Sequence, residues 1–526
     1  QVVESSVLEA AITYAKDLAA NKTIRRTSQI APMPVAADFF AEQRKAIAKK
    51  ARGFEAPPAA IDAVEASVTK PFAEGLQIEL AISRRLKASD QSRAQRHLFF
   101  GEREVARIPD IPKDIALRPI KAVGIIGAGT MGRGIAMACL NAGLTVRWLD
   151  RAQEFLDKGV EAVRATYQRD VEKGRYSDVV LAERMMRLTT SIDFASFADV
   201  DLVIEAAFED MKIKQDLFRQ LDAVCKPGAI LASNTSTLDV DQIASVTKRP
   251  ADVIGLHFFS PANVMRLLEV VRGKETAKDV VATAMSFGKH IGKVAVLSGV
   301  CFGFIGNRMF EGYVRESQNL LLEGATPSQV DKALTGYGMA MGPCAVMDLA
   351  GVDVSYLTRE GNRANLPNDP RYCLIGDKLY HMGRYGQKTG KGFYSYVNGK
   401  PEDDPEVLAL IKTEAQRLNV AQRAHTAEEI VARCLYPLIN EGVQILDEGI
   451  ALRPVDEDVV WVSGYGFPRY RGGPLFYADL IGLKTIVEGM TAFAASLGND
   501  FNYWTPAPLL AKLVAEGKTL NHWGRE

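Results

Sequence analysis

The sequence predicts a multidomain α/β protein, in which a domain with a parallel sheet precedes two related all-helical domains and follows a helical segment. Three observations predict this architecture. Strand-length apolar runs alternate with amphipathic stretches between about 120 and 298, helical periodicity dominates elsewhere, and the part after 298 contains an internal duplication. A chain of 526 residues is also too long for a single hydrophobic core.

The composition is that of an ordinary soluble globular protein, with 47% hydrophobic and 24% charged residues. The 64 Lys and Arg residues balance the 64 Asp and Glu residues, so charge does not favour a nucleic-acid or membrane partner. No apolar run approaches the roughly eighteen residues that a membrane helix needs. The six cysteines are scattered without a CxxC pair. This pattern favours buried thiols in a reducing compartment over disulfides, and we expect no metal site.

Residues 1–100 are rich in Ala, Lys, Arg and Glu and predict helices. Leu8, Ala11 and Leu18, for example, keep helical spacing. A Pro-spaced segment at 108–112 then predicts a linker to the next domain.

Five short apolar runs follow, and helical stretches separate most of them. They are 123–126, 145–149, 202–204, 229–232 and 253–256. That alternation predicts a parallel sheet with helices on both faces. After about 298 the strand signal fades.

The part after 298 repeats five features in the same order. Glu323-Gly324 recurs as Glu448-Gly449, Val330-Asp331 as Val455-Asp456, Gly336-Tyr337-Gly338 as Gly464-Tyr465-Gly466, Gly342-Pro343 as Gly473-Pro474, and Asp348-Leu349 as Asp479-Leu480. The offset grows along the chain, as insertions would cause. Two related helical domains are therefore predicted, and we expect the second to pack as support or as a dimer-like surface.

A glycine-rich motif, Gly-Ala-Gly-Thr-Met-Gly at 127–132, directly follows the first predicted strand and opens an apolar helix. Gly127 permits the tight turn, Gly129 lets the backbone approach a pyrophosphate, and Gly132 allows close packing of helix on strand. Asp150 ends the next strand, where a carboxylate holds ribose hydroxyls and repels a 2′-phosphate. The sequence thus predicts a Rossmann-type domain that binds NAD in preference to NADP. An ordinary glycine-rich turn is the alternative.

His257, at the end of the last predicted strand, is the candidate base. Oxidising an alcohol requires a group that accepts the hydroxyl proton as hydride leaves carbon, and histidine suits this role. Glu269 lies inside an apolar run, where a carboxylate could hold the other ring nitrogen. The Ser-Asn-Thr-Ser cluster at 233–236 offers a hydroxyl and an amide for the substrate oxygen. A histidine at a strand end is more often a core residue, but the upstream motif favours chemistry. These residues alone predict a dehydrogenase of an unknown alcohol.

Several motifs closely resemble those of 3-hydroxyacyl-CoA dehydrogenases. They lie at 128–135, 208–211, 233–236, 257–261 (His-Phe-Phe-Ser-Pro) and 303–308 (Gly-Phe-Ile-Gly-Asn-Arg). The duplicated part is similar to that of multifunctional β-oxidation proteins, both peroxisomal and bacterial. The resemblance covers about 120–500. It implies reversible, NAD-dependent oxidation of an (S)-3-hydroxyacyl-CoA to the 3-ketoacyl-CoA.

The resemblance also implies roles for single residues. It makes His257 the base, paired with Glu269, and it gives Ser236 and Asn307 contacts to the substrate oxygen. The implied cofactor-binding residues are Gly127, Gly129, Met131, Gly132, Asp150, Ala207, Phe208, Glu209, Lys214 and Ser236. A solvated helix residue is the alternative for Lys214, and a helix cap before the next arginine is the alternative for Asn307. Ser260 stands where many members carry Asn.

By the same resemblance, residues 1–117 are the tail of a crotonase-like domain with linker helices. Residues 118–297 form the NAD-binding domain, and 298–398 and 399–526 form the two helical domains. The complete protein is then expected to carry an enoyl-CoA hydratase, and in some members an isomerase, whereas this chain alone is expected to lack hydratase activity. We expect a bacterial cytoplasmic enzyme, or a peroxisomal one if the source is eukaryotic, although no C-terminal targeting tripeptide is present.

Two other functions compete with this interpretation. A 3-hydroxyacid dehydrogenase acting on free acids would use a lysine base, and nothing in the sequence replaces His257 and Glu269 in that way. A non-catalytic NAD-binding or structural protein would not need these residues together with Ser236 and Asn307. The expected partners are an acyl-CoA substrate and either a thiolase or no protein at all, in which case the chain is a monomer. Neither a nucleic acid nor a membrane span is expected.

Overall fold

The structure is a computed structural model that describes residues 3, 6–21 and 26–523. The chain divides into two compact units, Gln1–Arg93 and Ala94–Glu526.

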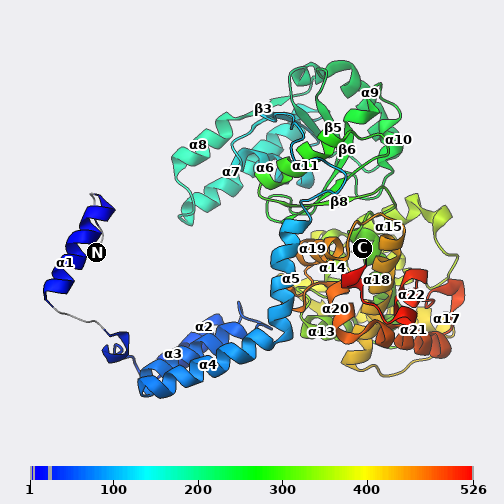
Figure 1. Cartoon of the computed structure of the whole chain (residues 1–526). Coiled ribbons are helices and arrows are strands. Elements are labelled where there is room, and N and C mark those ends of the chain that lie inside the picture. Colours follow the sequence, from blue (N-terminus) through cyan, green and yellow to red (C-terminus); the bar gives the residue numbers. More distant parts are fainter. Residues whose placement is uncertain (1–2, 4–5, 22–25, 524–526) are drawn as a thin grey trace. The chain divides into compact units, whose positions relative to one another are not determined.

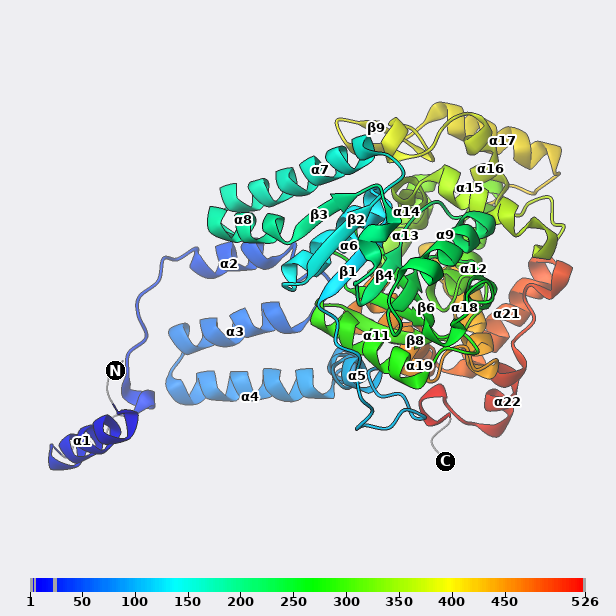
Figure 2. The same ribbon diagram turned by 90° about the horizontal axis from the view of Figure 1, so that it is seen from above.

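The first unit is helical, as its composition predicts. Its helices are α1 (Val7–Ala20), α2 (Phe39–Ile47), α3 (Ala56–Thr69) and α4 (Phe72–Ala88). α3 and α4 lie side by side (Figure 2). Gly75 permits this approach, since a Cβ there would lie 3.2 Å from the carbonyl oxygen of Ala66. Few side chains in this unit are buried, and they include Phe40 and Ala59. α5 (Asp90–Glu104) leads into the second unit.

The second unit begins with an eight-stranded sheet in the order β3-β2-β1-β4-β5-β6-β7-β8. The strands are β1 (Ala122–Ile126), β2 (Thr145–Leu149), β3 (Leu188–Ser191), β4 (Leu202–Glu205), β5 (Ile230–Ser233), β6 (Val253–Phe258), β7 (Leu267–Val271) and β8 (Val294–Ser298). The run from β3 to β6 has the strand order of a Rossmann sheet. The five predicted strands are confirmed as β1, β2, β4, β5 and β6. These five strands pair in parallel, as predicted, whereas β7, which was not among the predicted strands, runs antiparallel to β6.

Helices cover both faces of this sheet (Figure 1). On one face, α6 (Thr130–Asn141), α7 (Gln153–Glu172) and α11 (Lys278–His290) share a core with the strands. On the other face lie α9 (Met211–Val224) and α10 (Val240–Ala244). α8 (Asp178–Met186) packs against α7. Because both faces are covered, β4 and β6 are buried along their whole length.

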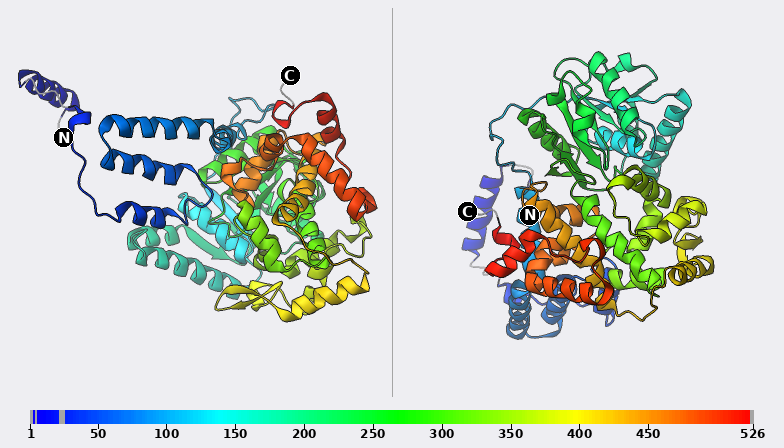
Figure 3. Two further views of the ribbon diagram at one scale, coloured as in Figure 1. Left: turned by 90° about the horizontal axis from the view of Figure 1, so that it is seen from below. Right: turned by 90° about the vertical axis from the view of Figure 1, so that its right-hand side faces the viewer.

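The remainder of the second unit is almost entirely helical. Its elements are α12 (Gly306–Leu322), α13 (Pro327–Tyr337), α14 (Pro343–Ala350), α15 (Val352–Gly361), α16 (Leu374–His381), a hairpin of β9 (Tyr394–Val397) and β10 (Lys400–Asp403), α17 (Pro405–Arg417), α18 (Ala427–Asp447), α19 (Pro454–Gly464), α20 (Pro474–Ile481), α21 (Leu483–Leu497) and α22 (Pro508–Glu516). The right-hand view of Figure 3 shows these helices beside the sheet domain. Both helical repeats share one hydrophobic core, which also takes in Leu98 from α5 and Leu267 from β7.

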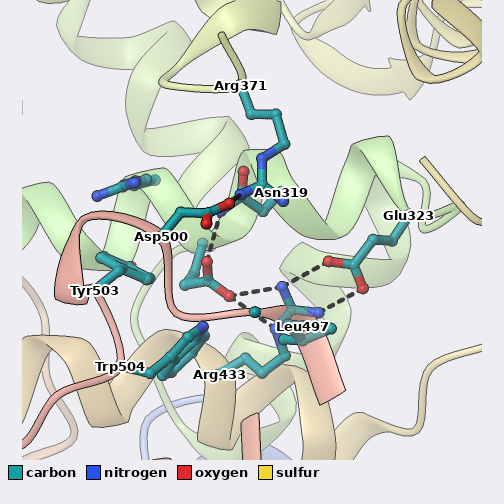
Figure 4. Close-up of a pocket in the computed structure, with 11 residues that line it drawn as sticks. Asn319, Glu323, Arg371, Arg433, Leu497, Asp500, Tyr503 and Trp504 are labelled. Carbon is teal, nitrogen blue, oxygen red and sulfur yellow. Dashed lines mark hydrogen bonds and ion pairs between the residues drawn. The ribbon is translucent and has the colours of Figure 1, made fainter. Parts of the chain in front are cut away.

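The predicted duplication appears in space as a reciprocal contact between α12 and α18. Arg308 on α12 pairs with Glu441 at 2.6 Å and Glu448 at 2.5 Å, and Arg433 on α18 pairs with Glu316 at 2.7 Å and Glu323 at 2.6 Å. Each α18 residue of this set lies 125 positions after its α12 counterpart. Figure 4 shows Arg433 against Glu323. A contact in which i meets j and j meets i is the signature of a two-fold interface, so the second repeat occupies the place of a partner for the first.

One predicted correspondence between the repeats is wrong. Asp331 accepts hydrogen bonds from the first backbone N–H groups of α14, at 2.9 and 3.0 Å. The residue that does the same for α20, at 2.8 and 3.2 Å, is Asp458. The counterpart of Asp331 is therefore Asp458 and not Asp456. The second Val-Asp dipeptide lies beside an insertion, so it repeats the sequence of the first but not its structural position.

Within residues 3, 6–21 and 26–523, no single helix is long and apolar enough to cross a membrane. α20 and α21 together reach the required length and composition, but they are bent by 92° and several of their apolar side chains lie in the core, among them Leu475, Ile486 and Met490. All six cysteines are free, and five are buried.

Candidate active site

The glycine loop after β1 has the geometry that a dinucleotide requires. Gly127 has a φ of +102°, and a Cβ there would lie 2.5 Å from the carbonyl oxygen of Ala206. A Cβ on Gly132 would overlap the carbonyl oxygen of Gly127, so α6 can approach β1 only with glycine at this position. Around Gly129, in contrast, no described atom lies within 4 Å of where a Cβ would be. The loop is therefore open on this side to a ligand, and the N-terminus of α6 supplies N–H groups for phosphates.

Asp150 follows β2 and lies beside this loop. Its Oδ2 accepts a hydrogen bond from the backbone N–H of Ala128 at 2.6 Å, and its Oδ1 accepts one from the backbone N–H of Arg151 at 2.7 Å. Trp148, buried in β2, donates its indole N–H to the carbonyl of Gly127 at 2.8 Å. Strand β2 thus fixes both the glycine loop and the carboxylate that the sequence predicts for the ribose.

His257 and Glu269 face each other across the antiparallel pair of β6 and β7. The two side chains are buried, and Nδ1 of His257 lies 2.6 Å from Oε2 of Glu269. Oε1 of Glu269 accepts a hydrogen bond of 2.9 Å from the backbone N–H of Gly306, the first residue of α12. Since the carboxylate accepts from Nδ1, the network assigns the ring proton to Nδ1 and leaves Nε2 free to accept a proton. The carboxylate therefore lies at the N-terminus of α12 and satisfies one of its free N–H groups.

Ser236 is held by Glu209. Oε1 of Glu209 accepts hydrogen bonds from the backbone N–H of Ser236 at 2.7 Å, from its hydroxyl at 3.1 Å, and from the hydroxyl of Thr235 at 2.7 Å. The predicted substrate contact is thus oriented by a residue predicted to bind the cofactor. Burial raises the pKa of Glu209, but Lys214 and these donors outweigh it, so the net pKa is lowered.

Lys214 lies between the carboxylates of Glu205 and Glu209. Its ammonium group is 2.8 and 2.9 Å from the oxygens of Glu205 and 3.2 Å from Glu209, and its side chain is 1% exposed. Burial lowers the pKa of Lys214, but the two carboxylates offset it and raise the net pKa. The alternative of a solvated helix residue is therefore wrong. Glu205 also accepts the hydroxyl of Ser233 at 2.7 Å, so the network ties β4, β5 and α9 together.

Asn307 bridges the sheet domain and the helical repeats. Its Nδ2 donates to the backbone carbonyl of Ser236 at 3.3 Å, and its Oδ1 accepts from the hydroxyl of Tyr465 at 2.7 Å. Asn307 is the second residue of α12, after the N-cap Ile305, and its side chain bonds to Ser236 and Tyr465 instead, so the alternative of a helix cap is wrong.

The structure thus brings together four predicted residues through direct or shared contacts. His257, Glu269, Ser236 and Asn307 meet where β5, β6 and β7 approach the start of α12. Phe208 is 67% exposed in the loop after β4, where a ligand can reach it.

Two residues at the site were not predicted. Glu205 ends an apolar strand, the same signal that identified Glu269. Tyr465 belongs to the repeated Gly-Tyr-Gly motif, which indicates a duplication but not a place in the active site.

Comparison with known proteins identifies the family. The family model described as 3-hydroxyacyl-CoA dehydrogenase, NAD binding domain, matches residues 122–301, and the one described as 3-hydroxyacyl-CoA dehydrogenase, C-terminal domain, matches both 303–396 and 430–525. The chain belongs to the 3-hydroxyacyl-CoA dehydrogenase family. The second of these models matches twice, in agreement with the duplication.

Relatives of this dehydrogenase include the peroxisomal bifunctional enzymes of Danio rerio and Homo sapiens. The first is 41% identical and the alignment covers 98% of this chain and 74% of the relative; the second is 38% identical, with 99% and 75% covered. Among solved structures, 3-hydroxybutyryl-CoA dehydrogenase from Escherichia coli gives a TM-score of 0.66 at 26% identity, with 76% of this chain and 99% of that chain covered. The dehydrogenase part of multifunctional enzyme 1 from C. elegans gives a TM-score of 0.58 at 31% identity, with 79% of this chain and 96% of that chain covered.

The family and its relatives confirm the predicted activity. This dehydrogenase is an NAD-dependent oxidoreductase that oxidises 3-hydroxyacyl-CoA in fatty acid β-oxidation. The described glycine loop and Asp150 fit this cofactor.

Proposed function

We propose that His257 is the base of this reaction. Nε2 of His257 takes the proton of the substrate C3 hydroxyl as the C3 carbonyl forms. NAD, which the glycine loop and Asp150 would hold, would supply the acceptor for the hydride of C3. Glu269 keeps the proton on Nδ1 and stabilises the imidazolium that forms. The observation that carries this proposal is the buried chain of contacts from His257 through Glu269 to the start of α12.

We assign the substrate oxygen to Ser236 and Asn307. A hydroxyl and an amide N–H can both donate to an oxygen that becomes a carbonyl, and donors fixed in advance are the most effective. The single O–H of Ser236 donates to Glu209 at 3.1 Å in this structure and turns to the substrate oxygen when substrate binds, whereas the amide of Asn307 is already oriented by Tyr465. The acyl-CoA is then expected between the sheet domain and the first helical repeat.

The remaining assignments concern the cofactor and the domains. We assign the pyrophosphate to the loop of Gly127, Gly129, Met131 and Gly132, the adenosine ribose to Asp150, and further contacts to Ala207, Phe208, Glu209 and Lys214. The division into 1–117, 118–297, 298–398 and 399–526 is proposed with them. Lys214 is enclosed by carboxylates, which supports an indirect role through Glu209.

Three further expectations stay predictions. They are a hydratase in the complete protein, either a thiolase that consumes the product or no protein partner, and the compartment, which is the bacterial cytoplasm or, if the source is eukaryotic, the peroxisome. The relatives named above are peroxisomal by name, which describes those proteins.

The base assignment is tested by His257→Ala, with His290→Ala as the matched control. His290 ends α11 and is exposed. We expect His257→Ala to lower kcat by roughly 10²–10⁴, with the Kd of NADH, measured by fluorescence, nearly unchanged. The control should keep wild-type turnover. Unchanged turnover in His257→Ala would remove this residue from the mechanism.

A further inference from the structure

We propose that Tyr465, from the second helical repeat, is a positioning residue that orients the amide of Asn307 for catalysis. This inference rests on the proposed contact between Asn307 and the substrate oxygen. It gives the second repeat a direct part in the site of the first, where the sequence predicted only support.

The hydrogen bonds of Asn307 determine which way its amide points. Tyr465 donates to Oδ1 at 2.7 Å, which directs the NH₂ group to the opposite side, toward the Ser236 carbonyl at 3.3 Å. An asparagine amide has similar shape in both orientations but opposite polarity. In the flipped orientation its oxygen would face the substrate oxygen and repel it. The tyrosine hydroxyl favours the catalytic orientation over the flipped one.

The start of α12 is built to admit Tyr465. Gly306 precedes Asn307, and a Cβ on it would lie 2.7 Å from Cζ of the Tyr465 ring. The backbone N–H of the same glycine donates to Glu269. One turn of α12 therefore serves both the base, through Gly306, and the substrate oxygen, through Asn307.

Aromatic packing fixes the ring of Tyr465. It stacks on Trp461 with centroids 4.7 Å apart, and it lies 5.5 Å from Phe310 and 5.4 Å from Phe259. Burial, and after it the charge of Glu269, raise the pKa of Tyr465 well above its usual range. The phenol therefore stays protonated and can only donate its hydrogen to the amide oxygen.

The duplication supplies an internal comparison. Tyr337 holds the same place in the Gly-Tyr-Gly motif of the first repeat. Its ring packs against Tyr477 and Phe467, with the guanidinium of Arg471 4.0 Å from its centroid. In the second repeat, Ala432 stands 125 positions after Asn307, so Tyr337 has no corresponding amide to orient. The same motif thus serves packing in one repeat and the active site in the other.

The test compares Tyr465→Phe with Tyr337→Phe in the full chain. Each change removes one hydroxyl and keeps the ring. Since one hydrogen bond is lost, we expect Tyr465→Phe to lower kcat about threefold to tenfold, with an unchanged Kd for NADH. Rates are expressed per bound NADH, so a partly unfolded preparation does not imitate the effect. Tyr337→Phe should keep wild-type kcat.

Asn307→Ala completes a double-mutant cycle. If Tyr465 acts through Asn307, adding Tyr465→Phe to Asn307→Ala causes no further loss of kcat. Equal losses in both backgrounds would overturn the proposal, as would a wild-type kcat in Tyr465→Phe while Asn307→Ala is impaired. Wild-type kcat in Asn307→Ala would instead refute the proposed substrate contact itself, so the two failures are distinguishable.

Discussion

Replacing Glu269 by glutamine changes the hydrogen bonding of the base without changing its volume. The carboxylate accepts two hydrogen bonds, from Nδ1 of His257 at 2.6 Å and from the N–H of Gly306 at 2.9 Å. A glutamine offers one acceptor and one donor. The N–H of Gly306 is fixed by α12, so the amide oxygen must stay there and the NH₂ group must face Nδ1. Nδ1 then becomes an acceptor, and the ring proton moves to Nε2, where it prevents uptake of the hydroxyl proton.

The expected loss follows from the wrong tautomer. In serine proteases, the corresponding Asp-to-Asn change costs about 10⁴ in kcat, and general acid–base catalysis contributes about 10²–10⁴. We therefore expect Glu269→Gln to lower kcat by about 10³–10⁴, or ~4–5.5 kcal/mol of transition-state stabilisation. The assay is gain of NADH absorbance with 3-hydroxybutyryl-CoA and NAD, the direction in which Nε2 must accept the hydroxyl proton, normalised to bound NADH.

Asp348→Asn is the matched control. Asp348 is another buried carboxylate, which accepts from the backbone N–H groups of Phe393 and Tyr394 at 2.8 and 3.0 Å and from the hydroxyl of Tyr396 at 3.0 Å. We expect this control to lose stability but to keep its turnover per bound NADH. A threefold change in turnover is less than the contribution of one hydrogen bond. If Glu269→Gln kept turnover within about threefold of wild type, the proposed change of tautomer would be refuted.

Three further predictions concern the cofactor, the buried charges and the first unit. Asp150→Ala should narrow the preference for NAD(H) over NADP(H), because the carboxylate that repels a 2′-phosphate is gone. The preference is measured as the ratio of kcat/KM for the two cofactors. Equal kcat/KM values in the wild type would refute the assignment of Asp150. Lys214→Met should lower the free energy of unfolding by about 3–5 kcal/mol at pH 7, because the buried Glu205 and the half-buried Glu209 lose their cation. The lowered pKa of Glu209 means that its stabilising contribution is complete above 4.5 and is lost as the pH falls through the folded pKa. The difference between variant and wild type in urea denaturation should therefore shrink at acid pH, and a constant difference would contradict the ion network. Finally, this chain should not hydrate crotonyl-CoA, because among the described residues before Ala122 there is no strand that could supply an oxyanion hole. Hydration is measured as loss of the conjugated thioester absorbance. Enzymatic loss of that absorbance would show that the interpretation of residues 1–100 is wrong.

The local parts of the site could be predicted from the sequence. The glycine motif lies between a strand and a helix only a few residues apart, and its geometry follows from glycine itself. His257 and Glu269 could both be selected, one at a strand end and one in an apolar run. Their contact could not be derived, because it depends on β7 pairing antiparallel with β6, and an apolar run carries no strand direction.

Contacts between distant segments could not be predicted at all. Tyr465 and Asn307 are 158 positions apart and meet only because the two repeats pack together. The ion pairs of Lys214 were missed for another reason: Glu205 and Glu209 lie only nine and five positions earlier, but the turn from β4 into α9 that brings the three charges together cannot be derived from the residues. The predicted correspondence of Asp331 with Asp456 is wrong because a dipeptide can recur by chance. The residue that caps the following helix, as Asp331 does, is Asp458.

The reaction proposed for this dehydrogenase is hydride transfer to and from a CoA thioester, with His257 as base. It is tested most directly by the rate of NADH oxidation with acetoacetyl-CoA and, in parallel, with free acetoacetate. We expect rapid NADH oxidation with the thioester, near-background NADH oxidation with the free acid, and loss of the thioester reaction in His257→Ala. Equal rates with both substrates, or a reaction confined to the free acid, would contradict it.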